Sequence, residues 1–282
     1  MTKQRLYTAG KEIKNIEGIF PRAVFYGDGV FETMRWKGAP PVFISRHIDR
    51  LLRAAAFLEI PSPDPEAVRA EITGAVEKSG FADCAVKICL ISGAPPSPFF
   101  EKPSFSQILV SVTEITDDLY GVPLKIIFSK KGYSRNSSPL STIKTLNYLE
   151  NVAAMREAGD AGFDDALLRG AGGCVAETTC RNIFWGKNGE IFTPPERCGI
   201  LPGITRGFLM EKARESGFQV SELMIQPEDM SHADFVFATN SLSGIRPVDK
   251  IQLQDLTLTF STSVNKPYAE IKNIVLQALN WV

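Results

Sequence analysis

Three short segments of the chain carry residue types that could bind and activate one small molecule. Lys144 supplies a primary amine, and it stands just before the segment 146–158, whose apolar spacing predicts a helix. The positive end of a helix dipole disfavours a charged ammonium, so this position would favour the neutral amine that forms a Schiff base with an aldehyde. A solvated surface lysine is the alternative that the position alone leaves open.

Glu177 is the second candidate, because it follows the glycine-rich run 172–176, where a strand is expected. A carboxylate there could pair with the protonated nitrogen of a pyridine ring, and that ion pair keeps the ring able to accept electrons. Asn182 and the hydroxyls of Thr178 and Thr179 could orient the same loop. An exposed carboxylate at the end of a strand is the competing interpretation.

The third candidate is an anion site at the expected start of a helix over 204–216, where the sequence reads PGIT over 202–205. Unpaired N–H groups at a helix N-terminus bind anions, and a glycine lets the ligand approach closely. A plain capped helix is the alternative for this segment. The loop around Thr239 and Asn240 is similarly small and hydroxyl-rich, and Arg50 is either a phosphate clamp or a surface arginine. An amine for an aldehyde, a carboxylate for a ring nitrogen and a phosphate site together fit pyridoxal 5′-phosphate.

Composition excludes several other classes of protein. The chain has 282 residues, 44% of them apolar and 22% charged, with a net charge of -1, so we expect neither nucleic acid nor an anionic membrane as partner. It has no apolar run near the ~20 residues that span a bilayer, and its first residues lack the apolar core of a secretory signal. Five cysteines without a C-x-x-C pair favour a reducing compartment, and we expect a cytoplasmic protein. With only two histidines, a His-based zinc site or a Ser-His-Asp triad is poorly supported, and no metal is expected.

The apolar pattern predicts an α+β chain of two domains. The expected linker, 116–121, gives a smaller domain over 1–118 and a larger one over 119–282. Ser45 is the expected N-cap of a helix over 46–58, and Asn188-Gly189 predicts a two-residue hairpin turn. Further helices are expected over 65–78, 146–158, 204–216 and 267–281. Strands are expected over 30–36, 41–44, 85–91, 107–114, 124–129, 165–169, 183–187, 190–192, 218–224, 234–239 and 245–248.

Taken together, these motifs resemble the fold-type IV pyridoxal-phosphate enzymes, also called class IV aminotransferases. That family includes branched-chain aminotransferases, D-amino-acid aminotransferases and aminodeoxychorismate lyases. The resemblance covers nearly the whole chain and keeps the order of the motifs. It rests on YGDGVFET over 26–33, HIDRL over 47–51, IKTLN over 143–147, ETTCRN over 177–182, LPGITR over 201–206 and TNS over 239–241.

The resemblance implies a two-domain fold with a small N-terminal α/β domain and a larger, β-barrel-like C-terminal domain. It implies pyridoxal 5′-phosphate as cofactor and a homodimer whose small domain helps cover the partner's site. Lys144 would form the Schiff base and act as general acid and base, and Glu177 would pair with the pyridine nitrogen. Arg50, Ile204 through its backbone N–H, Thr205 and Thr239 would hold the phosphate. Asn182 and Asn240 are further cofactor-binding candidates, and Tyr148 matches the family's ring-contacting tyrosine across a one-residue gap.

Within the family, 144–151 resembles the D-amino-acid aminotransferase and lyase branches, and 239–248 resembles the lyases most. The D-amino-acid enzymes carry an Arg-x-His pair where this chain reads SGAPPS over 92–97. Cleavage of aminodeoxychorismate to 4-aminobenzoate and pyruvate is therefore the preferred activity. A D-amino-acid or branched-chain-type transaminase is the first alternative, and a non-enzymatic protein that binds a phosphate ligand is the second.

Substrate contacts are sought on the strand over 30–36. Side chains alternate along a strand, so Phe31, Thr33 and Arg35 share one face and Glu32, Met34 and Trp36 the other, and one of these faces is expected to line the substrate pocket. Arg35, Arg135 and Arg246 are the candidates for binding a substrate carboxylate, and a surface or structural arginine is the alternative for each.

Overall fold

The computed structural model describes residues 4–8, 10–12, 21–93, 102–130, 138–279 and 281. The chain forms two compact units, the first over 1–118 with 143–147 and the second over 119–142 with 148–282. The break between Asp118 and Leu119 falls inside the expected linker. Residues 143–147 differ from expectation, because they belong with the first unit rather than with the second.

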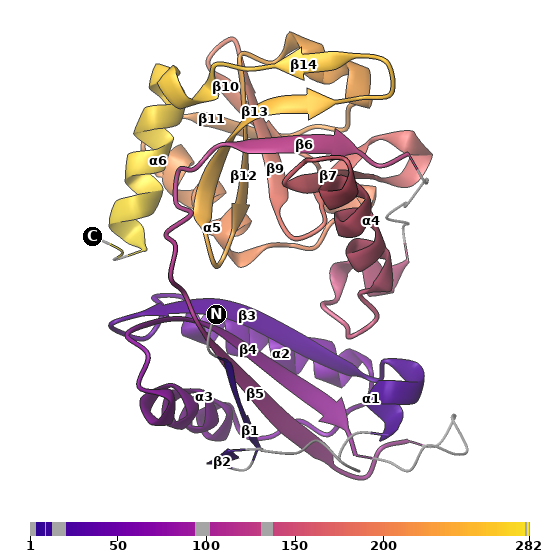
Figure 1. Cartoon of the computed structure of the whole chain (residues 1–282), viewed down its shortest axis with the longest axis vertical. Helices are drawn as coiled ribbons and strands as arrows, with labels where there is room; N and C mark the ends of the chain where they lie inside the picture. Colours follow the sequence, from indigo (N-terminus) through magenta and orange to yellow (C-terminus); the bar gives the residue numbers. More distant parts are fainter. Residues whose placement is uncertain are drawn as a thin grey trace. The chain divides into compact units, whose positions relative to one another are not determined.

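The first unit is an antiparallel sheet with the helices α1, α2 and α3 (Figure 1). Its strands run in the order β2-β1-β5-β4-β3. The elements are β1 Gln4–Thr8, β2 Lys11–Glu12, α1 Pro21–Tyr26, β3 Gly29–Lys37, α2 Ile44–Phe57, α3 Pro65–Ser79, β4 Asp83–Ser92 and β5 Ser106–Glu114.

Alternation along β3 assigns its two faces. Met34 and Trp36 pack in the core with Leu51 of α2 and Ile72 of α3. Phe31 and Thr33, which alternate with these core residues along the strand, point to the opposite face of the sheet. The register pairs Phe31 with Cys89 and Thr33 with Lys87 of β4, so these four residues share that face.

The start of α2 differs from the prediction. The helix begins at Ile44, its N-cap is Phe43 without a side-chain cap, and Ser45 lies in the first turn. Residues 41–44 do not form the expected strand, because the Ile44 N–H donates to the Pro41 carbonyl at 3.0 Å and closes a turn into the helix.

The second unit is a mixed, curled sheet in the order β11-β10-β9-β12-β13-β6-β7-β8, with β14 paired to β13 (Figure 1). Its strands are β6 Leu124–Phe128, β7 Asp165–Arg169, β8 Val175–Thr178, β9 Asn182–Lys187, β10 Glu190–Thr193, β11 Gln219–Glu222, β12 Phe235–Asn240, β13 Gly244–Gln252 and β14 Thr257–Thr259. Its α-helices are α4 Leu149–Asp160, α5 Ile204–Glu215 and α6 Lys266–Ala278. Short 3-10 turns are η1 Pro139–Thr142, η2 Ala171–Gly173, η3 Glu196–Cys198, η4 Pro227–His232 and η5 Thr262–Val264.

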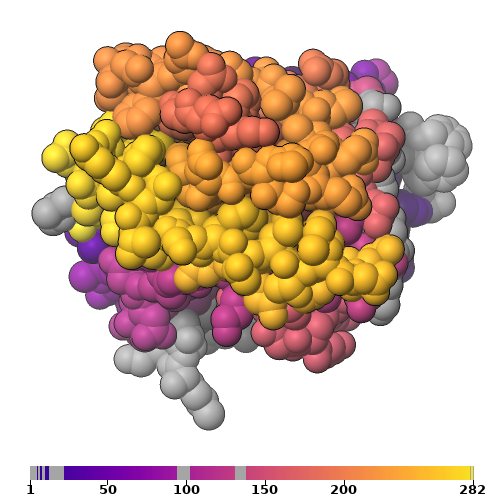
Figure 2. All heavy atoms as spheres, turned by 90° about the horizontal axis from the view of Figure 1, so that it is seen from above, coloured from indigo at the N-terminus to yellow at the C-terminus, as the bar shows by residue number. Residues whose placement is uncertain are grey.

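The two largest apolar clusters among the described residues of this unit pack on opposite faces of β9 and β12. Ile183 and Ala238 belong to the core formed by one face of the curled sheet. Phe184 and Phe237 stack with their centroids 5.0 Å apart and belong to the core that includes α5 and α6. The C-terminal segment that carries α6 lies on the surface of this unit, in yellow in Figure 2.

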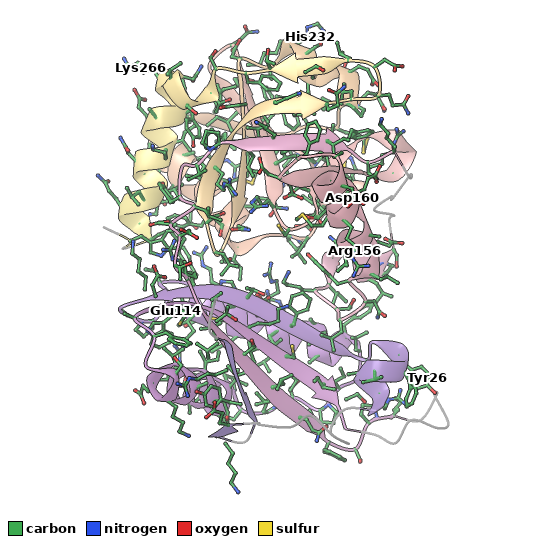
Figure 3. All side chains as sticks on the ribbon, in the orientation of Figure 1. Tyr26, Glu114, Arg156, Asp160, His232 and Lys266 are labelled. Atoms are coloured by element: carbon green, nitrogen blue, oxygen red, sulfur yellow. The ribbon has the colours of Figure 1, made fainter. Side chains whose placement is uncertain are left out.

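The hairpin turn is confirmed, because Asn188 and Gly189 have positive φ values of 52° and 82° and β9 pairs antiparallel with β10. Exposed polar and charged side chains, such as His232 of η4 and Arg156 and Asp160 of α4, lie on the surface of this unit (Figure 3). In the part of the chain that the structure describes, no helix is both long and apolar enough to cross a membrane.

Candidate active site

Lys144 lies in an extended segment that is added to the edge of β3. The Phe31 N–H donates to the Lys144 carbonyl at 2.8 Å, and the Leu146 N–H donates to the Gly29 carbonyl at 3.0 Å. The second bond keeps Leu146, the first residue of the expected helix, in the extended segment, and α4 begins only at Leu149. The argument from the helix dipole is therefore wrong, because that field falls off within the first helical turn. The Lys144 amine instead lies over the Phe31 ring, with Nζ 4.3 Å from the centroid.

Arg50 is held by a buried carboxylate rather than lying free on the surface. Its Nε and Nη2 donate to the two oxygens of Glu32 at 2.5 and 2.9 Å, and His47 Nδ1 lies 2.8 Å from the same carboxylate. Glu32 is 1% exposed. Burial alone would raise the pKa of Glu32, but the charges and hydrogen bonds of Arg50 and His47 outweigh it and hold the pKa at about 2. The phosphate-clamp interpretation of Arg50 stays a prediction, and its surface alternative is wrong.

The prediction that Arg35 binds a substrate carboxylate is wrong. Its guanidinium is buried, donates to both oxygens of Asp83 at 2.8 and 2.5 Å, and bonds Asp118 at 2.9 Å. Burial alone would lower the pKa of Arg35, but the two aspartates outweigh it and raise that pKa. A guanidinium so engaged holds the end of the sheet together instead of awaiting a ligand.

Lys87 is a cation that sequence reasoning missed. It lies on the face of the sheet that carries Phe31 and Thr33, and its Nζ is 5.1 Å from the Phe31 centroid. Its side chain is exposed, and it forms no ion pair with any residue that the structure describes. Strand alternation around Thr33 could have indicated it, had the pairing of β3 with β4 been known.

The same prediction is wrong for Arg246. Arg135, the third candidate, lies outside the described residues. Arg246 pairs across the ladder with Ala238, so its side chain lies on the opposite face of the sheet from Thr239. It is buried and donates to the carbonyls of Val122 and Pro123 at 2.8 and 3.1 Å. Burial and the neighbouring Arg181 lower the pKa of Arg246.

Glu177 is a buried carboxylate at the end of β8, not an exposed one. Its side chain is 5% exposed, and Oε2 accepts from Asn182 Nδ2 at 3.0 Å and from the Leu201 N–H at 3.1 Å. Asn182 Nδ2 also donates to the Leu201 carbonyl at 2.9 Å. The carboxylate and the loop that leads into α5 are therefore fixed to each other through Asn182.

The N-terminus of α5 is built to accept an anion. Gly203 is its N-cap and offers no side-chain cap, so the first N–H groups of the helix stay available. A Cβ on Gly203 would lie 2.0 Å from Asn182 Oδ1, so the close approach of the two segments requires glycine. Thr205 is buried, and its Oγ1 lies 3.4 Å from Ser241 Oγ.

Thr239 supplies an independent sign of a ligand at the end of β12. It is 1% exposed, and its Oγ1 has no hydrogen-bond partner among the described residues. Leaving a buried hydroxyl unpaired costs about 1–3 kcal/mol, which a bound oxyanion would recover. An uncapped helix start, a buried threonine awaiting a partner and a buried carboxylate fit the phosphate and the ring nitrogen of pyridoxal phosphate.

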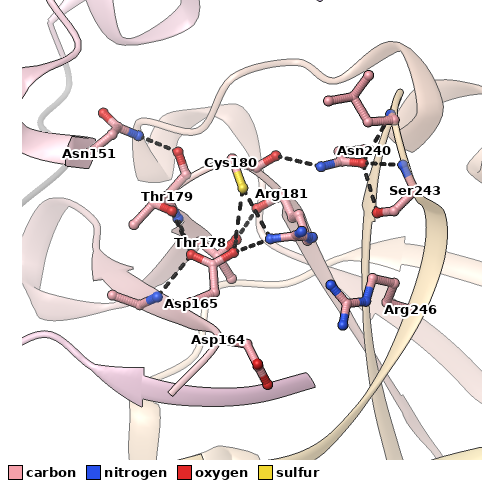
Figure 4. Close-up of polar contacts among 12 residues, drawn as sticks. Asn151, Asp164, Asp165, Thr178, Thr179, Cys180, Arg181, Asn240, Ser243 and Arg246 are labelled. Atoms are coloured by element: carbon pink, nitrogen blue, oxygen red, sulfur yellow. Dashed lines mark hydrogen bonds and ion pairs between the residues drawn. The ribbon is translucent and has the colours of Figure 1, made fainter. Parts of the chain in front are cut away.

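Tyr148 and Asn240 have partners that define their local roles. Tyr148, the N-cap residue of α4, donates from its hydroxyl to the Thr179 carbonyl at 3.1 Å. Asn240 closes the turn after β12, because its Oδ1 accepts from the N–H groups of Leu242 and Ser243 at 3.1 and 2.8 Å. Its Nδ2 donates to the Cys180 carbonyl at 3.3 Å (Figure 4). Both side chains contact the loop that follows Glu177.

The chain belongs to the class IV aminotransferase family, whose model matches residues 29–251. It is 28% identical over 258 residues to the aminodeoxychorismate lyase of Bacillus subtilis, covering 88% of this chain and 86% of that protein. It is 30% identical over 271 residues to a Methanocaldococcus jannaschii protein provisionally named a branched-chain-amino-acid aminotransferase, covering 88% of each.

A solved structure agrees with the sequence comparisons. A Legionella pneumophila protein, provisionally named a 4-amino-4-deoxychorismate lyase, matches with a TM-score of 0.84 and 31% identity over 94% of this chain and 96% of that one. The expected fold is confirmed, and the chain is a pyridoxal-phosphate-dependent enzyme of the lyase and aminotransferase family.

Proposed function

We propose that the chain binds pyridoxal 5′-phosphate and cleaves 4-amino-4-deoxychorismate to 4-aminobenzoate and pyruvate. The observation that carries the cofactor assignment is the buried Thr239 hydroxyl, which has no hydrogen-bond partner among the described residues, together with the uncapped start of α5. The lyase assignment is supported by the lyase-like segment 239–248 and by the B. subtilis and L. pneumophila relatives.

Each residue has a role that follows from its surroundings. The N–H of Ile204 and the hydroxyls of Thr205 and Thr239 would bind the phosphate, and the resemblance to the family adds the Arg50 guanidinium. Glu177 would bind the protonated ring nitrogen, since the donors Asn182 Nδ2 and Leu201 N–H fix the position of its carboxylate. The cofactor, when bound, supplies the electron sink that stabilises a carbanion.

Lys144 has two tasks in this proposal. Its amine would hold the cofactor aldehyde until substrate arrives, and the freed amine would then remove the proton from the substrate ring that allows aromatisation and loss of pyruvate. The Phe31 ring beneath Nζ limits where the amine can move and shields one side of it from water. Phe31 is thus proposed to aim Lys144, and Thr33 and Lys87 to meet the substrate on the same face of the sheet.

Lys87, rather than Arg35 or Arg246, is proposed to bind a carboxylate of the substrate. An aminodeoxychorismate-type substrate carries carboxylates, and an exposed ammonium with no counter-ion among the described residues is suited to one of them. A transaminase remains the second candidate, supported by the 30% identity to the M. jannaschii protein. In that reaction Lys144 would move a proton between the α-carbon of an amino acid and the cofactor. By its resemblance to the family, the chain is also proposed to form a homodimer, which sedimentation of the purified protein would test.

One experiment separates the candidates. The purified chain and Lys144→Ala are mixed with pyridoxal phosphate, their visible absorbance is recorded, and aminodeoxychorismate is then added without an amino acceptor. A lyase has a Lys144-dependent band and releases pyruvate in proportion to 4-aminobenzoate. A transaminase has the band, releases no pyruvate, and loses the band when an amino acid is added alone. A chain whose absorbance does not depend on Lys144 would contradict both enzymes and favour a binding protein.

A further inference from the structure

Asp165, at the first residue of β7, is a buried carboxylate on which one loop converges. It is 0% exposed. Thr178 Oγ1 donates to it at 2.8 Å, Thr179 donates through Oγ1 at 2.5 Å and through its N–H at 3.1 Å, and Arg181 Nη1 donates at 2.5 Å (Figure 4). All of these donors lie within 178–181, the loop that directly follows Glu177.

The carbonyl groups of the same loop accept hydrogen bonds from other parts of the unit. The Thr179 carbonyl accepts from the Tyr148 hydroxyl at 3.1 Å and from Asn151 Nδ2 at 2.7 Å. The Cys180 carbonyl accepts from Asn240, the residue after Thr239. The loop therefore joins the segment of Glu177 to the N-cap of α4 and to the end of β12.

Glu177 and Thr178 also lie on opposite faces of β8, as neighbouring residues of a strand must. Thr178 contacts Asp165 on one face, and Glu177 contacts Asn182 and the Leu201 N–H on the other. Asp165 thus fixes the backbone next to Glu177 from the opposite face of β8.

We propose that Asp165 is a positioning residue for the cofactor site, acting through the loop 178–181 on Glu177, Tyr148 and the Thr239 end of β12. This inference rests on the proposed binding of pyridoxal phosphate. A positioning role differs from a purely stabilising one in what it predicts. Removing the Asp165 contacts to the loop should weaken the binding of pyridoxal phosphate even in a variant that is still folded.

The test uses Asp165→Asn, which keeps the size of the side chain and removes its charge. Because this variant leaves the nearly buried Arg181 guanidinium without its counter-ion, the double variant Asp165→Asn/Arg181→Met serves where the single one does not fold. Thr262→Val is the control. Its buried hydroxyl bonds the Val236 N–H and the Val248 carbonyl and has no contact with the loop, so it costs stability alone.

Three measurements are made on each folded variant: the melting temperature, the dissociation constant of pyridoxal phosphate, and the pH midpoint of the bound cofactor's absorbance. For Asp165→Asn we expect the dissociation constant to rise about tenfold, the size of one lost charged hydrogen bond, and the midpoint to shift. For Thr262→Val we expect only the melting temperature to change.

Tyr148→Phe, alone and combined with Asp165→Asn, tests whether the two residues affect the dissociation constant of pyridoxal phosphate through the same loop. Tyr148 and Asp165 hold the same residue, Thr179, so their effects on the dissociation constant should be less than multiplicative in the double variant. A melting temperature that falls while the dissociation constant, the midpoint and the coupling stay as in the wild type would overturn the inference. A wild-type chain without a Lys144-dependent band would overturn the proposed cofactor and the inference with it.

Discussion

Replacing Glu32 by glutamine tests the buried charge network between β3 and α2. The pKa of this carboxyl is lowered from 4.5 to about 2 in the folded chain. Each pKa unit by which the folded and unfolded states differ contributes about 1.4 kcal/mol. The ionised Glu32 carboxylate therefore stabilises the fold by about 3 kcal/mol at pH 7. Glu32→Gln should lower the free energy of unfolding by about that amount, because Arg50 and His47 lose their charged partner.

The pH dependence has a definite sign. A lowered folded-state pKa gives stability that is fully present above about pH 5 and is lost as the pH falls from there towards 2. The difference between wild type and Glu32→Gln should therefore be constant from pH 5 to 7 and shrink below that range. Urea unfolding at a series of pH values measures it, and hydrogen exchange in peptides from β3 and α2 assigns the loss to the first unit.

The control and the cofactor readout sharpen this test. Glu77→Gln removes an exposed carboxylate on α3 that has no ion-pair partner among the described residues, and it should change stability by less than about 0.5 kcal/mol. If Glu32 orients Arg50 towards a phosphate, Glu32→Gln should weaken the binding of pyridoxal phosphate but not of pyridoxal, which lacks that group. Unchanged stability at pH 7, or a difference that persists at pH 2, would refute the reasoning.

Three further substitutions have distinct expected outcomes. Gly203→Ala places a Cβ 2.0 Å from Asn182 Oδ1 and should raise the dissociation constant of pyridoxal phosphate at least tenfold in an absorbance titration. Thr239→Val removes an unpaired buried hydroxyl, so calorimetry should show the cofactor-free chain stabilised by about 1 kcal/mol while cofactor binding weakens. Lys87→Met should raise KM for carboxylate-bearing substrates about tenfold with kcat nearly unchanged, whereas Lys125→Met, at an exposed strand lysine of the second unit, should leave KM as in the wild type.

The candidate residues with local signals could be predicted from the sequence. The PGIT run over 202–205 predicts an anion site at the start of a helix, and in the structure α5 begins at Ile204 without a side-chain cap. Asn188-Gly189 indicates a hairpin because both residues tolerate positive φ, and both have it. In each case the chemistry depends on neighbours in the chain, which a sequence displays directly.

The residues that were misjudged depend on distant partners. Arg35 and Arg50 are both strand- or helix-borne arginines in the sequence, and only the tertiary contacts with Asp83, Asp118 and Glu32 show what each one holds. The helical pattern begins at Leu146, but the hydrogen bond from the Leu146 N–H to the Gly29 carbonyl of β3 keeps this residue out of the helix. Asp165 offered one overlooked signal, a charged residue that opens an otherwise apolar strand.

Register is the property that connects the fold to the chemistry. Cross-strand pairing places Asn182 opposite Thr239, so the residue that fixes Glu177 shares a face with the proposed phosphate ligand. Shifting β9 by one residue would exchange that face for the one that carries Ile183 and Ala238 in the apolar core. The Asn188-Gly189 turn limits such a shift, because a two-residue hairpin allows only one pairing of Lys187 with Glu190. Gly189 should therefore matter to cofactor binding although it lies at the opposite end of β9 from Asn182, and a longer turn there should weaken binding more than its effect on stability alone predicts.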